Sequence, residues 1–439
     1  MSLWAFRFVL WYICILFVQP QNRFEFLYPL HIANLSIIIA VVFHAMAALS
    51  EGRPIIRFGP CTVTMLLLLA ASFVSLYLGP LQASGAWNPY IDIIAKNAIV
   101  AILIEATAFT VDRVWAVQMT LYLGSLWWVK AGLRLSAAGA TSTGDRLMGP
   151  AVSLVENSNG FAYMMCLLLP FYLYVYQQER NKYLKVIFLA LSLAVVYIIL
   201  KTGSRTGLMI LIVLLIGVLP KYASKHKVAL ILGGVVVFFL FSHIGGLNLK
   251  RFQSIPDSIR SFLLGDTKAY DEMDQEEQSA KDRRDKNHDA WGLIREYPLF
   301  GVGINPDEDL FFDRFPNAAG QVHCEILTAG KEMGIIGMTL YVMPLVILYK
   351  RGRNVQKATR GTWPAVSDMG WTLSMQAIVV AVGGSFSPLP WNAPSVFLVA
   401  CASSLWNIVG SKDTPALTRS AQLRGTSTSG IAPVQALNS

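Results

Sequence analysis

The segment QVHCEILTAGKEMGIIG, residues 321–337, places His323 and two glutamates at the entrance to an apolar run. A neutral imidazole can accept a proton near neutral pH, because its ordinary pKa is about 6.5. A histidine at a helix start also serves as a cap or a packing group, so both interpretations remain open. Several cations predicted on the same face of the molecule favour a general base at His323.

Two of these cations lie in LKTGSRTGLM, at the short junction between two apolar runs. The junction is so short that Lys201 and Arg205 must sit at or just under the membrane interface. Such residues can be anchors whose charged ends reach water while their stems stay in lipid. They can also be fixed cations facing a cavity, and a guanidinium suits phosphate because it offers a planar fork of donors and keeps its charge.

Further candidates lie in SAKDRRDKNHDAWGLIREYPLFGVG, which begins at residue 279. Helical spacing puts Arg284 and His288 four residues apart, with Arg283 and Trp291 on a neighbouring strip. The segment predicts an amphipathic helix on the membrane surface. A solvated charged face explains most of these charges one by one, but it explains the Arg283–Arg284 pair less well.

Arg146 precedes the run ENSNGFA, which opens another apolar segment. Asn157 and Asn159 within that run can cap a helix, or they can support a ligand site. Asp307 and Asp309 resemble a two-carboxylate clip for a hard cation. That pattern is short and common, so we predict no metal and no other cofactor.

The chain has 439 residues, of which 54% are hydrophobic and 14% charged, and its mean hydropathy is +0.49. This composition predicts an all-α polytopic integral membrane protein. A span needs about 20 apolar residues, and this length fits twelve places in the sequence. The predicted spans are centred near residues 12, 38, 70, 100, 121, 167, 192, 212, 236, 338, 377 and 399. The fourth and fifth are the weakest. Lys96 and Glu105 within the fourth either pair inside the bundle or lie toward the ends of a tilted span, where their charged groups reach water.

Lysines and arginines accumulate in the short loops of one side, which predicts that both termini are cytoplasmic. The net charge of +9 is then largely a topology signal, and nucleic-acid binding is not expected. Residues 1–245 hold spans 1–9, residues 323–410 hold spans 10–12, and residues 411–439 form a disordered cytoplasmic tail. Residues 246–322 form one large external loop, between spans 9 and 10, with fifteen acidic and ten basic residues.

Taken together, TGSRTGLM, SAKDR followed fifteen residues later by PLFGVG, and VHCEILTAGKEMGIIG resemble the O-antigen ligase and polymerase superfamily. Arg146 with ENSNGFA also resembles that family's arginine and Asn-rich entry to a middle span. The resemblance covers residues 130–345. It implies a GT-C-like architecture in the bacterial inner membrane, with the large loop and the active site on the periplasmic face.

The resemblance also implies a reaction and roles for residues. These enzymes move a glycan from undecaprenyl diphosphate to an acceptor hydroxyl with inversion, without a metal. By position, Arg205 and Arg283 are then diphosphate ligands and His323 activates the acceptor. The secondary candidates are Arg146, Arg284 and Lys201 for the donor, with Asn157, Asn159, His288 and Glu325 as supporting residues. The two residues after the histidine, Cys324 and Glu325, differ from the family pattern. This difference affects the expected contact with the acceptor more than the chemistry.

Several functions remain open at this level. A ligase would use a lipid A-core sugar as acceptor, whereas a polymerase of the same superfamily would use another lipid-linked glycan. A glycan ligase acting on protein is a third variant. A secondary transporter for an anion is the alternative from a different class. Transporters often carry inverted repeats and spans broken at the membrane midplane. No repeat is evident, and the cations gather on one external face, which favours the enzyme. Its partners would be the lipid-linked donor, the acceptor and membrane lipids.

Overall fold

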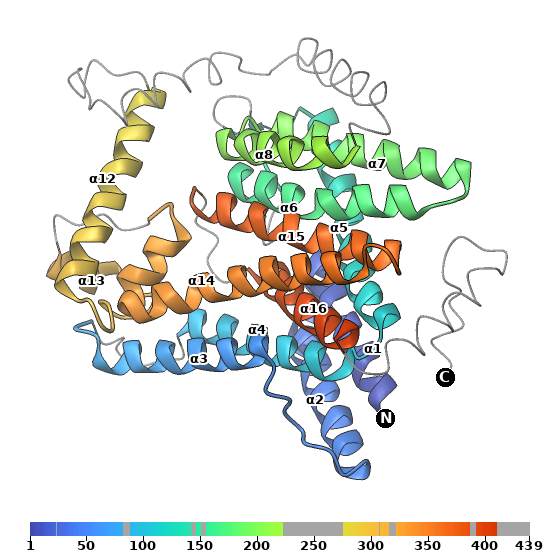
Figure 1. The fold of residues 1–439 in the computed structure, drawn as a ribbon. Helices are drawn as coiled ribbons and strands as arrows, with labels where there is room; N and C mark the ends of the chain where they lie inside the picture. Colours follow the sequence, from blue (N-terminus) through green and yellow to red (C-terminus); the bar gives the residue numbers. More distant parts are fainter. Residues whose placement is uncertain are drawn as a thin grey trace.

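The computed structural model describes residues 1–22, 24–81, 88–139, 141–142, 146–150, 155–222, 275–306, 308–315, 322–386 and 392–410. These residues form a helical bundle with one short hairpin, β1 paired antiparallel with β2 (Figure 1). The elements are α1 (Ser2–Val18), η1 (Pro20–Asn22), η2 (Glu25–Leu30), α2 (Ile32–Ser50), α3 (Pro60–Leu78), α4 (Pro89–Thr107), α5 (Val111–Ala137), β1 (Thr141–Ser142), β2 (Arg146–Leu147), α6 (Ser158–Gln178), α7 (Lys182–Lys201), α8 (Arg205–Tyr222), α12 (Gln275–Glu296), α13 (Glu308–Arg314), α14 (Glu325–Thr359), α15 (Pro364–Gly384) and α16 (Ala393–Val409).

The apolar runs form the expected helices. Eleven of the twelve predicted span centres fall within helices, and the centre near residue 236 lies outside the described residues. In the described part of the chain, seven helical segments are long and apolar enough to cross a membrane. Helices α4 and α5, the two weakest predictions, are not among those seven. The large loop contains α12 and α13, and residues 411–439 also lie outside the description.

The charges inside α4 have partners different from those predicted. Lys96 Nζ lies 2.5 Å from Asp92 Oδ2, one turn earlier in the same helix. Glu105 Oε2 accepts hydrogen bonds from the Thr62 backbone N–H at 2.8 Å and from its hydroxyl at 2.5 Å. Glu105 therefore caps the first turn of α3, where unpaired N–H groups and the helix dipole favour a carboxylate. The alternative in which Lys96 pairs with Glu105 was wrong, because each charge has a nearer partner.

Helix α14 is broken near its beginning. Gly334 has φ 66° and ψ −163°, which interrupts the helical hydrogen bonds and separates a short first segment from a long second one. The sequence predicted one continuous span centred near residue 338, and the break corrects that expectation. In a membrane each backbone group that a break leaves unpaired costs several kcal/mol, so protein groups must replace the lost bonds.

The turn between α12 and α13 supplies these bonds. The Val302 and Gly303 N–H groups donate to the carbonyls of residues 331 and 332 at 2.9 and 3.2 Å, and the Ile335 N–H donates to the Pro298 carbonyl at 2.8 Å. The Ser75 hydroxyl of α3 also donates to the carbonyl of residue 332, at 2.6 Å. We call this joint between residues 298–303 and 331–335 the clasp. It binds the end of α12 to the break in α14.

Side chains extend the contact between the two helices. A Cβ built on Gly330 of α14 would lie 2.6 Å from Ile294 Cδ1 of α12, so the Ile294 side chain packs directly against the α14 backbone there. Leu293 of α12 also joins a small buried cluster with Leu81, Val302 and Phe311. As a result α12 lies across the end of the bundle at which α6 and α8 begin and α7 and α15 end (Figure 1).

Replacing Gly334 with alanine is expected to destabilise the protein. The new Cβ would lie 2.5 Å from the Leu299 carbonyl, at a φ of 66°. A positive φ combined with ψ near 180° is essentially restricted to glycine and costs another residue about 1–3 kcal/mol, and overpacking costs about 1–3 kcal/mol more. Thermal unfolding in detergent would measure the loss. The matched control is Gly292→Ala on α12, where no atom lies within 4 Å of the new Cβ. Equal melting temperatures for the two variants would show that the break does not constrain α14.

Candidate functional site

His323 stands just before the first segment of α14, whose N-cap is Cys324. Its ring is half-buried, and among the described residues no protein group hydrogen-bonds its buried Nδ1 atom. The clasp fixes the C-terminal end of the segment that follows it. The position of the imidazole is therefore set by a helix of about two turns that is held to the protein at its far end.

Burial and two cations act on this imidazole. Burial is the larger cause, and Arg283 and Lys286 of α12 add to it, so that the pKa of His323 falls to about 4. Each cause disfavours the charged ring, because a cation in a poorly hydrated place is repelled by other cations. At neutral pH the ring is therefore uncharged and able to accept a proton.

The face of α12 that turns inward follows helical spacing. Arg283 and Lys286 are partly buried, and Ala290 and Ile294 further along the same face are buried. His288 lies on the outer face, where its side chain is 87% exposed and sits 3.8 Å from Asp289. Arg284 Nε lies 3.9 Å from Asp285. Of the residues predicted on this helix, Arg283 is the one that the structure brings to His323.

A second group of polar side chains gathers where α6 and α8 begin. The Arg146 Nη2 atom donates to Asn159 Oδ1 at 2.7 Å, and its Nε atom donates to the Thr202 carbonyl at 3.2 Å. The Ser204 hydroxyl donates to the same Asn159 oxygen at 2.9 Å. The structure thus joins Arg146 and Asn159, predicted separately, to the TGSR turn. Asn157 has a different role, because its side chain caps α6 by accepting from the Gly160 N–H at 2.6 Å.

Lys201 and Arg205 flank this turn. Lys201 is the last residue of α7 and Arg205 the first of α8, and both are partly buried. Arg205 therefore lies at a helix N-terminus, where backbone N–H groups and the helix dipole also attract anions.

The end of α15 links the two groups. A Cβ on Gly384 would lie 2.7 Å from Glu325 Oε2, and a Cβ on Gly383 would lie 2.4 Å from the Tyr163 ring. Glu325 is two residues after His323, and Tyr163 is one turn after Asn159 on α6. Because Gly383 and Gly384 have no side chains, the start of α14 and the first turns of α6 both pack closely against the end of α15. Glu325 is fully buried there, so it is placed to support the entrance rather than to face solvent.

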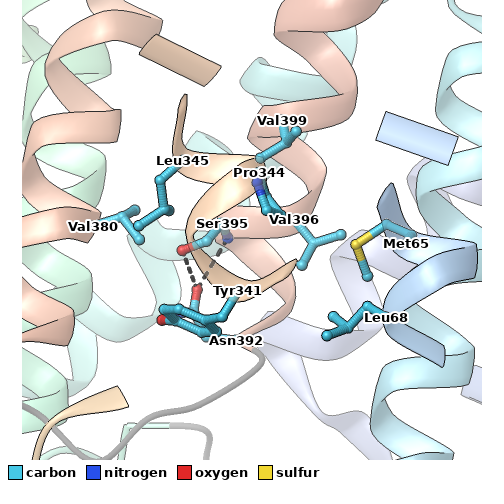
Figure 2. Close-up of a pocket in the computed structure, with 10 residues that line it drawn as sticks. All are labelled: Met65, Leu68, Tyr341, Pro344, Leu345, Val380, Asn392, Ser395, Val396 and Val399. Carbon is cyan, nitrogen blue, oxygen red and sulfur yellow. Dashed lines mark hydrogen bonds between the residues drawn. The ribbon is translucent and has the colours of Figure 1, made fainter. Parts of the chain in front are cut away.

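A small pocket lies deeper in the bundle, among α3, α14, α15 and α16 (Figure 2). Its volume is about 40 Å³, whereas ligand pockets usually measure about 300–1,000 Å³. Asn392 and Ser395, joined by hydrogen bonds, lie with Tyr341 toward one end of it, and aliphatic side chains line the rest (Figure 2). The pocket is too small and too apolar to hold a diphosphate or a sugar.

Within the described ranges, no three His, Cys, Asp or Glu side chains are grouped so that they could hold a metal ion. Asp307 of the predicted acidic clip falls outside those ranges. The sequence reasoning missed Lys286 and the role of Ser204. The signal for Lys286 was its spacing of three residues from Arg283, which places both on one helical face.

Residues 190–342 match the family model described as O-antigen ligase. The matched segment spans about a third of the chain. The match confirms the resemblance to the superfamily and supports a function of the O-antigen ligase or polymerase type. It includes Arg205, Arg283, the clasp and His323, whereas Arg146 and Asn159 precede it. No curated protein matches the chain.

Lys286→Gln is expected to raise the pKa of His323, because it removes one of the positive charges that oppose protonation. Diethyl pyrocarbonate reacts with neutral imidazole, so modification of the peptide containing His323 can be followed by mass spectrometry from pH 4 to 8. The ring in the wild type should stay reactive until the pH approaches 4, and the midpoint in the variant should be higher. Arg295→Gln, an exposed position on the same helix, serves as the control. A midpoint unchanged by Lys286→Gln would contradict the electrostatic account.

Proposed function

We propose that the protein is a glycosyltransferase that moves a glycan from undecaprenyl diphosphate to an acceptor sugar hydroxyl, as an O-antigen ligase with a lipid A-core acceptor. The observation that carries the proposal is a neutral, half-buried imidazole at His323, facing Arg283 and Lys286 inside the segment that matches the O-antigen ligase model. Transfer of a glycan from a glycosyl diphosphate needs a base for the acceptor hydroxyl and fixed positive charge for the leaving diphosphate, and this arrangement offers both.

The cations serve the leaving group. As the bond between the anomeric carbon and the phosphate oxygen breaks, its electron pair stays on the diphosphate, and negative charge grows there. Arg205 and Arg283 are the proposed ligands of that charge, and Lys201 and Arg284 are secondary candidates. Fixed positive groups in a water-poor site stabilise such a transition state strongly, and they can do so without a metal.

His323 serves the acceptor. Its neutral ring would take the hydroxyl proton while the acceptor oxygen forms the new bond to the anomeric carbon from the side opposite the diphosphate. That geometry inverts the anomeric centre. Donor binding also improves the base, because the negative diphosphate offsets the field of Arg283 and raises the pKa of the imidazole. The base then becomes stronger when the substrate is present.

The location of the site follows from the membrane. We propose that it lies on the periplasmic face of the bacterial inner membrane, with both termini in the cytoplasm and the lipid tail of the donor in the bilayer. Arg205 and Arg283 then lie on the side where arginines are scarce in short loops. Their presence there is explained by phosphate binding.

The transporter alternative is disfavoured by the clasp. Broken helices in transporters leave carbonyl groups free to coordinate ions. Here the carbonyls of Lys331 and Glu332 accept hydrogen bonds from Val302, Gly303 and Ser75. These two carbonyls are therefore paired within the protein and serve to position a helix, which speaks against their use as ligands of a coupling cation.

His323→Ala is expected to lower turnover about 10²- to 10⁴-fold, the usual contribution of a positioned general base. Arg205→Ala and Arg283→Ala are expected to lower it by about 10²- to 10³-fold, as for other groups that stabilise developing charge. The assay follows release of undecaprenyl diphosphate from a lipid-linked oligosaccharide in vesicles, with a lipid A-core acceptor and a chelator present. Arg295→Ala on the outer face of α12 is the control, with activity near that of the wild type.

The product separates the related functions. A larger glycolipid built on the lipid A-core acceptor identifies a ligase, and growth of the glycan on the donor lipid identifies a polymerase. Folded wild-type protein that turns over no lipid-linked donor would contradict the proposed function. Full activity of His323→Ala would contradict the assignment of the base.

A further inference from the structure

The hydrogen bonds around Asn159 connect three segments that are distant in sequence. Asn159 Oδ1 accepts from Arg146 Nη2 at 2.7 Å and from Ser204 Oγ at 2.9 Å. Arg146 Nε donates in addition to the Thr202 carbonyl at 3.2 Å. One side-chain oxygen on α6 thus holds the first residue of β2 and the turn between α7 and α8 in a fixed relation.

The turn itself depends on these bonds. The Ser204 hydroxyl accepts from the Gly207 N–H at 3.2 Å, which makes Ser204 the cap of α8, while the same hydroxyl donates to Asn159. Gly203, just before it, has φ 59°, and a Cβ there would lie 3.6 Å from Arg146 Cγ. The stem of Arg146 lies against the turn. Its guanidinium donates directly to the Thr202 carbonyl and is connected to Ser204 through Asn159, which accepts from both.

Arg205 follows Ser204 directly and begins α8. The turn therefore fixes the backbone position of Arg205. If the turn shifts, the Arg205 side chain shifts with it. Two nitrogens of Arg146 are committed to protein oxygens, at Thr202 and Asn159. Arg146 is thus built to hold the turn that carries Arg205.

We propose that Arg146 and Asn159 are positioning residues, which act on the donor diphosphate through Arg205 and are not phosphate ligands themselves. The inference rests on the proposed function, because it assigns diphosphate binding to Arg205. The proposal also explains why residue 159 is an asparagine and not an aspartate. An amide oxygen accepts both hydrogen bonds without placing a negative charge beside the diphosphate.

A double-mutant cycle tests the coupling. The probe is undecaprenyl diphosphate, and its binding is measured to the full-length chain in lipid nanodiscs for wild type, Asn159→Ala, Arg205→Ala and the double variant. Asn159→Ala should weaken binding roughly tenfold when Arg205 is present and less than about twofold when it is absent, since residues that act through one another are not additive. The same cycle with Arg146→Gln in place of Asn159→Ala should show the same dependence on Arg205. A tenfold loss that persists without Arg205 would overturn the proposal, because it would mean independent contacts with the phosphate.

Hydrogen exchange reports on the turn without any ligand. Asn159→Ala should speed amide exchange in residues 202–207, where the Ser204 and Gly207 N–H groups bond to hydroxyl oxygens. Asn159→Asp keeps both acceptor positions, so it should retain slow exchange but weaken probe binding through its added charge. Unchanged exchange in Asn159→Ala would overturn the positioning role. Arg205→Ala that binds the probe as the wild type does would instead overturn the proposed function, and the exchange data would still decide whether Asn159 holds the turn.

Discussion

The clasp is the constraint on which the arrangement of the site depends. A helix broken at Gly334 within an apolar segment must have its freed carbonyls paired by protein, because lipid offers no donors. Residues 298–303 supply two of those donors, and α3 supplies a third through Ser75. The same turn ends α12. The helix that carries Arg283 and the short helix that follows His323 are therefore held as one unit, mainly by backbone hydrogen bonds.

This arrangement explains why the glycines of the turn and of the break belong together. A Cβ on Gly301 would lie 2.3 Å from the carbonyl carbon of residue 332, and Gly301 also has a positive φ of 68°. No other residue type fits a backbone contact that close. The PLFGVG and KEMGIIG segments are thus two halves of one joint, although about thirty residues of chain separate them.

The sequence predicted well what depends on local composition. Apolar runs of sufficient length became helices because no other structure satisfies the backbone there, and Arg205 at the end of such a run was predictable as an interfacial cation. The features that could not be predicted from the sequence depend on contacts between residues that are distant in the chain. Asn159 and Ser204 are 45 residues apart, so spacing gives no sign that they meet. Likewise α12 carries charges on both faces, so only its packing on α14 distinguishes Arg283 and Lys286 from Arg284 and His288. The break at Gly334 was hidden because a single glycine in an apolar run is ordinary in membrane helices.

The two cationic groups differ in how they are held, and the difference matches what each must do. Arg205 begins a helix whose cap is bonded to Asn159, so its position is set by a network within the bundle. Arg283 lies on α12, outside the bundle, and reaches the site through the clasp. Because the clasp joins α12 to the short helix that follows His323, a small movement of α12 would carry Arg283 and His323 together relative to Arg205. The effect of Arg283 on the pKa of His323 would then be kept, while the distance between Arg205 and Arg283 would change. The position of one helix thus sets the spacing of the two proposed diphosphate ligands without changing the surroundings of the proposed base.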